Sequence, residues 1–150
     1  ARILQALALQ PTDCVLESGT GGGYLAACLA QLASTVVSVD IVADFVDAAR
    51  HKLKAHGFGN VTLSVGDASH GWSARRYDAI AVTGSVPAVA EIWRQSLSLN
   101  GRLFIVTGRS PAMEALLITR IGEQEWMQES LFETELPLLR NAAAPKTFEF

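Results

Sequence analysis

Residues 14–40 read CVLESGTGGGYLAACLAQLASTVVSVD, and this stretch decides the fold. A short apolar run that ends in a carboxylate, residues 14–17, leads into a glycine-rich turn over residues 18–23. Alanine and leucine then dominate Tyr24–Leu32, which is typical of a helix that packs closely on a sheet. A second apolar run, residues 36–39, is followed by a carboxylate. The pattern predicts a strand, a glycine turn, a helix and a second buried strand.

The alternation of strands and helices continues along the chain. Phe45, Ala49 and Leu53 recur every fourth residue and predict a second amphipathic helix that stops at Gly57. The other segments expected are helices at residues 3–9 and 90–97 and strands at residues 61–65, 79–82, 103–106, 116–121 and 131–136. The last two strands have no convincing helix between them and are expected to pair antiparallel, and residues 147–150 could return to the sheet edge. Alternation of this kind predicts a parallel sheet covered on both faces.

The composition narrows the class of protein. The chain has 150 residues, 49% of them hydrophobic, which fits one domain with a single core over residues 1–150. Twelve Lys and Arg against 15 Asp and Glu give a net charge of −3, so nucleic acid is not an expected partner. Polar residues interrupt the apolar runs well before the roughly 20 residues that a membrane span needs, so no membrane association is expected.

The two cysteines, Cys14 and Cys28, have no partner at metal-ligand spacing, so no metal site is predicted. Both are expected to be buried thiols, which is consistent with a reducing compartment. The sequence therefore predicts a cytoplasmic protein, and we expect it to be a monomer.

The glycine turn is the candidate functional feature. Glycine fills four of the five positions from 19 to 23, which is more than a single tight turn requires. A turn without side chains lets the backbone approach a ligand closely, with the N–H groups of the next helix pointing outward. We therefore predict a cofactor seat between the first strand and its helix.

The turn alone leaves the choice of cofactor open. Nicotinamide enzymes use glycines in the pattern G-x-G-x-x-G or A. If the pattern starts at Gly19, its last position is Tyr24, which is too bulky for the close packing of helix and strand required there. If the pattern starts at Gly21, its first glycine lies four residues after Glu17, which is too late for the end of the strand. Neither alignment is satisfactory, so further residues have to decide between a nicotinamide and another nucleoside-bearing cofactor.

Two carboxylates are expected at the same edge of the sheet. Asp40 ends the second strand, and Asp67 follows the third strand, Val61–Val65. Asp40 could accept hydrogen bonds from both ribose hydroxyls of a nucleoside, and Asp67 could accept one from an adenine amino group. The alternatives are a favourable charge at a helix N-terminus for Asp40 and a turn-forming side chain for Asp67. Asp40 alone would suit a nicotinamide cofactor equally well.

Several segments together carry a resemblance to a known family. They are residues 17–24 (ESGTGGGY), 38–40 (SVD), 65–67 (VGD), 77–83 (YDAIAVT), 99–103 (LNGRL) and 131–138 (LFETELPL). Their order and spacing resemble those of protein-L-isoaspartate O-methyltransferases, which are class I S-adenosylmethionine-dependent methyltransferases. The resemblance implies a Rossmann-like, doubly wound α/β fold with a mostly parallel seven-stranded sheet and an antiparallel last strand. It implies S-adenosylmethionine as the cofactor.

The resemblance also identifies candidate site residues. The predicted cofactor-binding residues are Glu17, Gly19, Thr20, Gly21, Gly23, Asp40, Ile41, Asp67 and Ala68. Thr83 and Ser85, just beyond the expected fourth strand, could line the acceptor pocket, or they could be loop hydroxyls that bond to the backbone. Residues 84–86, Gly-Ser-Val, stand where the family usually has small alanines, and Ala68 replaces a frequent glycine.

The family's substrate-side serine or threonine lies in a segment that precedes the helix before the first strand. The chain starts at about that helix, so no catalytic residue is predicted, and we expect this domain to lack an N-terminal substrate-side segment. Methyl transfer to a carboxylate requires alignment and exclusion of water. An isoaspartyl carboxyl, with a pKa of about 4, is already ionised at neutral pH and needs no general base.

The predicted function is carboxyl O-methylation of L-isoaspartyl residues in damaged proteins or peptides, which is a protein-repair reaction dependent on S-adenosylmethionine. One alternative is a truncated or non-catalytic module that only binds S-adenosylmethionine. The other, from a different enzyme class, is a nicotinamide-dependent oxidoreductase.

Overall fold

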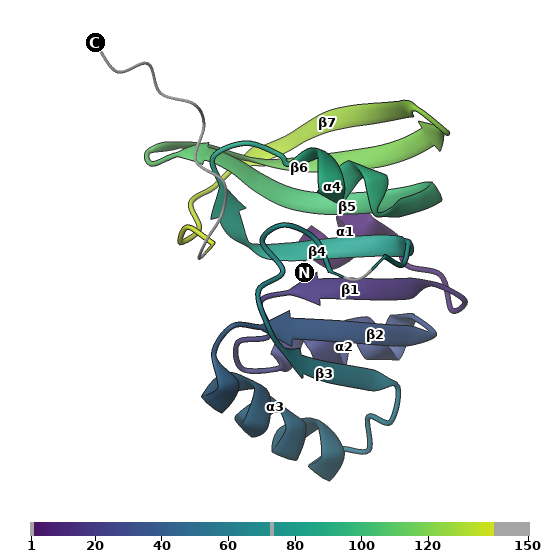
Figure 1. Ribbon diagram of the computed structural model, residues 1–150, viewed down its shortest axis with the longest axis vertical. Helices are drawn as coiled ribbons and strands as arrows, with labels where there is room; N and C mark the ends of the chain where they lie inside the picture. Colours follow the sequence, from purple (N-terminus) through teal and green to yellow (C-terminus); the bar gives the residue numbers. More distant parts are fainter. Residues whose placement is uncertain (1, 73, 140–150) are drawn as a thin grey trace.

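The computed structural model describes residues 2–72 and 74–139, whose strands form one seven-stranded sheet (Figure 1). The strands are β1 (Cys14–Ser18), β2 (Thr35–Asp40), β3 (Val61–Val65), β4 (Tyr77–Val86), β5 (Leu97–Arg109), β6 (Ala112–Gly122) and β7 (Glu125–Glu133). Their order in the sheet is β3-β2-β1-β4-β5-β6-β7. The order changes direction between β1 and β4, which is the position where open α/β sheets bind ligands.

The pairs that β1 to β5 form with one another are parallel, whereas the β5–β6 and β6–β7 pairs are antiparallel. The predicted doubly wound α/β fold with an antiparallel end is therefore confirmed. Because β6 is antiparallel to both of its neighbours, it is the strand that runs against the others, and β7 returns to the direction of β5. The β7 strand begins six residues before the expected start at Leu131, because a tight turn after Gly122 brings the chain straight back.

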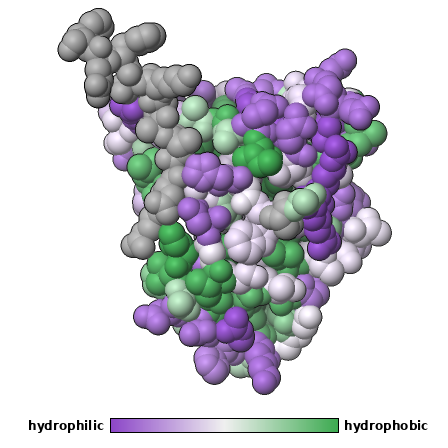
Figure 2. Space-filling model, viewed as in Figure 1, coloured by the Kyte–Doolittle hydropathy of each residue, from purple (hydrophilic) through white to green (hydrophobic). Residues whose placement is uncertain are grey.

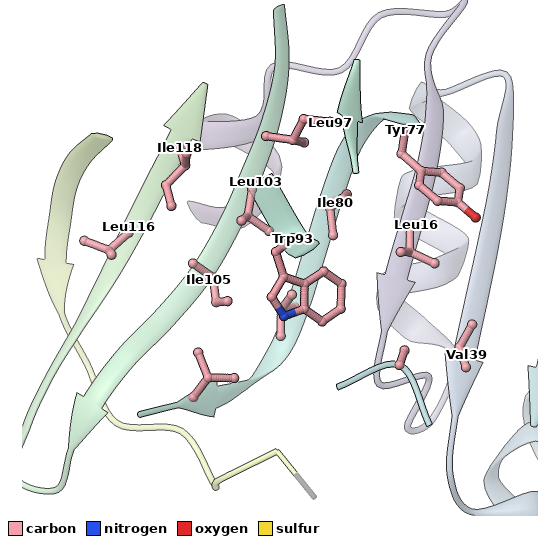
Figure 3. Close-up of a cluster of buried hydrophobic side chains, with 13 residues drawn as sticks. Leu16, Val39, Tyr77, Ile80, Trp93, Leu97, Leu103, Ile105, Leu116 and Ile118 are labelled. Carbon is pink, nitrogen blue, oxygen red and sulfur yellow. The ribbon is translucent and has the colours of Figure 1, made fainter. Parts of the chain in front are cut away.

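The helices are α1 (Arg2–Leu7), α2 (Tyr24–Leu32), α3 (Ala43–Ala55) and α4 (Glu91–Gln95). Leu7 of α1 and Leu29 of α2 are buried in one apolar cluster with alternate residues of the central strands, such as Val15. Trp93 of α4 lies in the cluster on the opposite face, among side chains of β4 and β5 (Figure 3). The sheet is thus covered on both faces, as the apolar strands predict.

No helix joins β3 to β4 in the part of the chain that the structure describes, although a strictly alternating fold would have one there. The loop that follows β3 carries Trp72, which packs against the same cluster as Trp93. Aromatic side chains bury a large apolar area each. The loop therefore covers part of this face in place of a helix.

The observed strands β4 and β6 extend beyond their predicted ranges at both ends, and other elements begin or end elsewhere than predicted. The first helix ends at Leu7, two residues early, because Ala8 has a positive φ of 46°. β5 begins at Leu97 instead of Leu103, because Leu97 pairs with Tyr77 and the expected turn at Asn100 is an irregularity within the strand. The helix expected over residues 90–97 is correspondingly shorter.

Phe45 is not a core residue, which contradicts the predicted stripe of α3. Val46, Ala49 and Leu53 form the buried side of this helix, and the side chain of Phe45 is 50% exposed. A buried helical stripe follows spacings of three and four residues, so residues 46, 49 and 53 satisfy it and Phe45 is turned away.

Both cysteines are free but only half-buried, so the expectation of buried thiols was wrong in the degree of burial. Within residues 2–72 and 74–139, none of the helices combines the length and apolar character needed to cross a membrane. The strand expected at residues 147–150 lies outside the described residues.

Candidate functional site

A cavity of about 410 Å³ opens at the edge of the sheet where β1, β2, β3 and β4 end. Its lining residues are Ser18, Gly19, Gly21, Val39, Asp40, Ile41, Val42, Phe45, Gly66, Asp67, Ala68, Ser69, Thr83, Gly84, Pro137, Leu138 and Leu139. In Figure 2, apolar residues gather in the lower left of the view, the side toward which the β1 and β2 arrows point in Figure 1. The predicted edge of the sheet therefore holds a largely apolar cavity with two carboxylates.

The glycine turn forms one side of the cavity and depends on glycine at particular positions. Gly19, Gly21 and Gly23 all have positive φ values, of 103°, 51° and 83°. A Cβ on Gly19 would lie 2.0 Å from Oγ1 of Thr83, which is far inside van der Waals contact. Only glycine is compatible with both this φ and this close approach. The turn thus presents bare backbone to the cavity.

Thr83 lines the cavity, and its hydroxyl bonds to the glycine turn. Its Oγ1 donates to the carbonyl oxygens of Ser18 and Gly19, at 2.8 and 3.0 Å. Thr83 lies within β4 and not beyond its end, because β4 extends to Val86. The side chain therefore joins β4 to the turn after β1. Its hydroxyl bonds to the backbone, which is the alternative that the sequence left open for Thr83.

Asp40 connects the turn to the next helix. Its Oδ2 accepts a hydrogen bond from the N–H of Gly21 at 3.0 Å, and its Oδ1 accepts one from the N–H of Val42 at 2.9 Å. Val42 is the N-cap residue of α3, so the carboxylate also satisfies a helix terminus. Each carboxylate oxygen has a second lone pair that can accept a further hydrogen bond from a ligand. Asp40 is thus placed both to shape the site and to bind in it.

The loop after β3 forms the opposite end of the cavity. Asp67 and Ala68 line it, and Oδ1 of Asp67 accepts a hydrogen bond from the N–H of Ser69 at 2.9 Å. A Cβ on Gly66 would lie 2.6 Å from the ring of Trp72. The Trp72 ring therefore packs directly on the loop backbone, and this contact positions the loop beside Asp67.

Three of the predicted cofactor-binding residues lie outside the cavity lining. Glu17 and Thr20 are buried beneath the turn, at 0% and 3% exposure, and Gly23 is the N-cap of α2. Burial raises the pKa of the Glu17 carboxyl from 4.5 to about 8, a hydrogen bond from Ser38 opposes the shift, and the charge of Asp40 adds to it. These residues contribute to the site through the turn that they support.

Ser85 does not line the cavity, so its predicted place in an acceptor pocket was wrong. It is fully buried, and its Oγ donates to the carbonyl oxygen of Leu136 at 2.9 Å. Its backbone N–H donates to Pro137 and its carbonyl accepts from Leu139, both at 2.8 Å. The Ser85 hydroxyl is occupied by this hydrogen bond because the chain after β7 returns to the end of β4 and pairs with it there.

The returning segment, residues 137–139, was not predicted as part of the site. It contributes three apolar residues to the cavity wall. A Cβ on Gly84 would lie 3.1 Å from Cβ of Leu139, so the small residue at this position makes room for the segment. Phe45 was also missed, because its helical spacing suggested a place in the core. The sequence signal that could have revealed it is the adjacent Val46, which completes the buried stripe equally well.

Comparison with known proteins agrees with this geometry. The family model for protein-L-isoaspartate(D-aspartate) O-methyltransferase matches residues 1–138. A protein-L-isoaspartate O-methyltransferase from Rhodopseudomonas palustris is 39% identical over 142 residues, which cover 93% of this chain and 65% of that protein. The chain thus spans slightly less than two thirds of the length of this curated relative.

Solved structures show the same fold. A protein-L-isoaspartate O-methyltransferase superposes with a TM-score of 0.81 and 26% identity, over 91% of this chain and 45% of that one. A SAM-dependent methyltransferase from Thiobacillus denitrificans, in complex with S-adenosyl-L-homocysteine, has a TM-score of 0.59 and 25% identity, over 70% and 46%. With the family model matching most of its length, the chain belongs to the protein-L-isoaspartate(D-aspartate) O-methyltransferase family.

Proposed function

We propose that the cavity binds S-adenosylmethionine, with Asp40 accepting hydrogen bonds from the ribose hydroxyls and Asp67 lying at the adenine end. The two carboxylates, the bare backbone at Gly19 and the apolar lining fit an adenosine-bearing ligand, which offers hydroxyl and amino donors on a largely apolar base. Ile41 and Ala68 each follow one of these carboxylates and line the same cavity, so they are placed to contact the base.

We further propose that residues 1–150 form the cofactor-binding domain of an enzyme that methylates L-isoaspartyl residues of damaged proteins or peptides. Membership of the family supports this reaction, and it disfavours the nicotinamide-dependent alternative. S-adenosylmethionine supplies a methyl group bonded to a positively charged sulfur. The isoaspartyl carboxylate would form a C–O bond to that methyl group as the C–S bond breaks, so the products are a methyl ester and a neutral thioether.

Protein repair in the cytoplasm, carried out by a monomer, is part of the same proposal. The two cysteines are free, and free thiols are typical of proteins in reducing compartments. The remaining alternative is a module that binds the cofactor without catalysis, and the methylation experiment described below distinguishes it from an enzyme.

The Asp40→Ala variant tests cofactor binding. We expect the affinity for S-adenosylhomocysteine, measured by isothermal titration calorimetry, to fall about 10- to 150-fold, since a hydrogen bond to a charged group contributes about 1.5–3 kcal/mol. The control is Asp47→Ala, which removes an exposed carboxylate on the outer part of α3. Equal affinities for Asp40→Ala and the unaltered protein would exclude the ribose contact, and no saturable binding by the unaltered protein would exclude the cofactor.

Methyl transfer tests the reaction itself. The complete protein should transfer labelled methyl from S-adenosylmethionine to a peptide that contains one isoaspartyl residue. A peptide of the same sequence with an ordinary aspartyl residue should be labelled at least tenfold more slowly. If cofactor binding is measurable and neither peptide is labelled, the non-catalytic alternative holds instead.

A further inference from the structure

Three polar side chains form a buried chain of hydrogen bonds beneath the glycine turn. They are Glu17 at the end of β1, Ser38 on β2 and Thr20 within the turn, and none is more than 3% exposed. Oγ of Ser38 donates to Oε1 of Glu17 at 2.5 Å, and Oγ1 of Thr20 lies 2.7 Å from Oγ of Ser38. Because Ser38 has one hydroxyl proton and donates it to Glu17, Thr20 is the donor to Ser38. The carboxyl is thus linked to the turn by two successive hydrogen bonds.

The second carboxyl oxygen has no such partner. Among the described residues, Oε2 of Glu17 is buried and receives no hydrogen bond. An ionised carboxylate in this position would have one buried oxygen with no donor among the described residues, which costs far more free energy than burying a neutral acid. Burial accordingly raises the pKa of Glu17 to about 8, so that the carboxyl is mostly protonated at pH 7.

The charges near Glu17 also oppose its ionisation. Asp40, at the end of β2, acts on Glu17 as a like charge and raises its pKa further. The α2 helix that follows the turn has neither acidic residues in its first turn nor basic residues in its last, and its titratable groups are Tyr24 and Cys28. On β4, the titratable groups are Tyr77 and Asp78 at the start of the strand, and Asp78 accepts a hydrogen bond from the N–H of Cys14 at the far end of β1. No cation on these three elements, β2, α2 and β4, offsets a charge on Glu17.

We propose that Glu17 is a positioning residue whose uncharged form, acting through Ser38 and Thr20, holds the glycine turn in the shape that receives adenosine. This inference rests on the proposed cofactor function. It differs from a direct contact, because Glu17 does not line the cavity. With Glu17 uncharged, the carboxylates of Asp40 and Asp67 supply the negative charge of the cavity lining within the described part of the chain.

Ionisation of Glu17 would change the turn. The charged form needs donors for both oxygens, and beneath the turn they could come only from water entering the core or from a rearrangement of Ser38 and Thr20. Thr20 lies between Gly19 and Gly21, two residues with positive φ, so a shift of its side chain displaces the backbone that faces the cavity. Adenosine affinity should therefore decrease as Glu17 loses its proton.

The test is a pH titration of ligand affinity in the complete protein. Adenosine is the probe, because it lacks the amino and carboxyl groups whose own titration would complicate the result. Between pH 7 and pH 9 the affinity should fall about tenfold, in proportion to the protonated fraction of a group with a pKa of about 8. The Glu17→Gln variant, neutral and of similar shape, should keep its affinity within threefold over this range. Glu129→Gln on β7, an exposed carboxylate, should behave like the unaltered protein.

A second variant interrupts the link without touching the carboxyl. Thr20→Val keeps the shape of the side chain and removes its hydroxyl, so it should bind adenosine more weakly at pH 7 and lose most of the pH dependence. The proposal is overturned if Glu17→Gln retains the tenfold fall, or if it binds at least tenfold more weakly at pH 7, which would mean that the ionised form is required. Absence of adenosine binding by the unaltered protein at pH 7 would instead contradict the proposed cofactor site.

Discussion

A Gly19→Ala variant is expected to bind S-adenosylhomocysteine more than 100-fold more weakly than the unaltered protein. The new Cβ would lie 2.0 Å from Oγ1 of Thr83, a side chain whose hydroxyl bonds to Ser18 and Gly19. The backbone would also have to leave its φ of 103°, because alanine rarely adopts that conformation. Relief of either conflict moves the turn, and a loss of about 2.7 kcal/mol in binding corresponds to 100-fold.

Gly22→Ala is the matched control within the same turn. A Cβ at this position meets nothing within 4 Å, and Gly22 is not among the residues with positive φ. Calorimetry at one pH on both variants should show a loss of less than fivefold for Gly22→Ala. Similar losses for the two variants would mean that the close approach between Gly19 and Thr83 does not govern the site. Circular dichroism of both variants would show whether the fold is retained.

The carboxylates of the cavity could be predicted because they depend on a rule of topology. Carboxyl ends of parallel strands meet at one edge of a sheet, and ligands bind there at the point where the strand order changes direction. Asp40 and Asp67 each end or follow a strand, so knowing the strands was sufficient to bring them together. The structure places both in the lining of one cavity.

The side chains beneath the turn could not be assigned in this way. Glu17 also ends a strand, and the sequence does not indicate whether its carboxyl points to the cavity or under the turn. That depends on Ser38, which is brought beside it by the pairing of β1 with β2. Neighbours provided by strand register are tertiary contacts, and a pattern within one strand contains no information about them.

The wall formed by residues 137–139 shows a second limit of the sequence. These residues follow β7, which lies at the far edge of the sheet from β3. The chain returns from that edge to pair with Ser85 of β4. Such a long-range return has no local signal beyond Pro137, which only indicates that the strand has ended. The requirement for a small residue at Gly84 comes from its contact with Leu139, which no local pattern predicts.

The free energy of unfolding of the Glu17→Gln variant is expected to rise relative to that of the unaltered protein as the pH rises from 4.5 to 8. The pKa of Glu17 is about 8 in the folded protein, against an ordinary value of 4.5. Between these values the folded state holds a proton that the unfolded state has released, so the free energy of unfolding falls with rising pH. The contribution of Glu17 to stability is complete below pH 4.5 and is lost above pH 8. Glutamine binds no proton in either state and lacks this dependence.

The size of the effect follows from the difference between the two pKa values. Each pKa unit corresponds to about 1.4 kcal/mol, so a shift of this size is worth up to about 5 kcal/mol, part of a typical total of about 5–15 kcal/mol. Urea unfolding at intervals from pH 5 to pH 8.5 would measure the difference between the two proteins. That difference should grow by several kcal/mol in favour of Glu17→Gln, with Glu129→Gln as the exposed control. A difference that stays constant over this range would mean that Glu17 is ionised in the folded protein. In that case the proposal that an uncharged Glu17 carboxyl supports the glycine turn would be wrong, whatever the ligand titration shows.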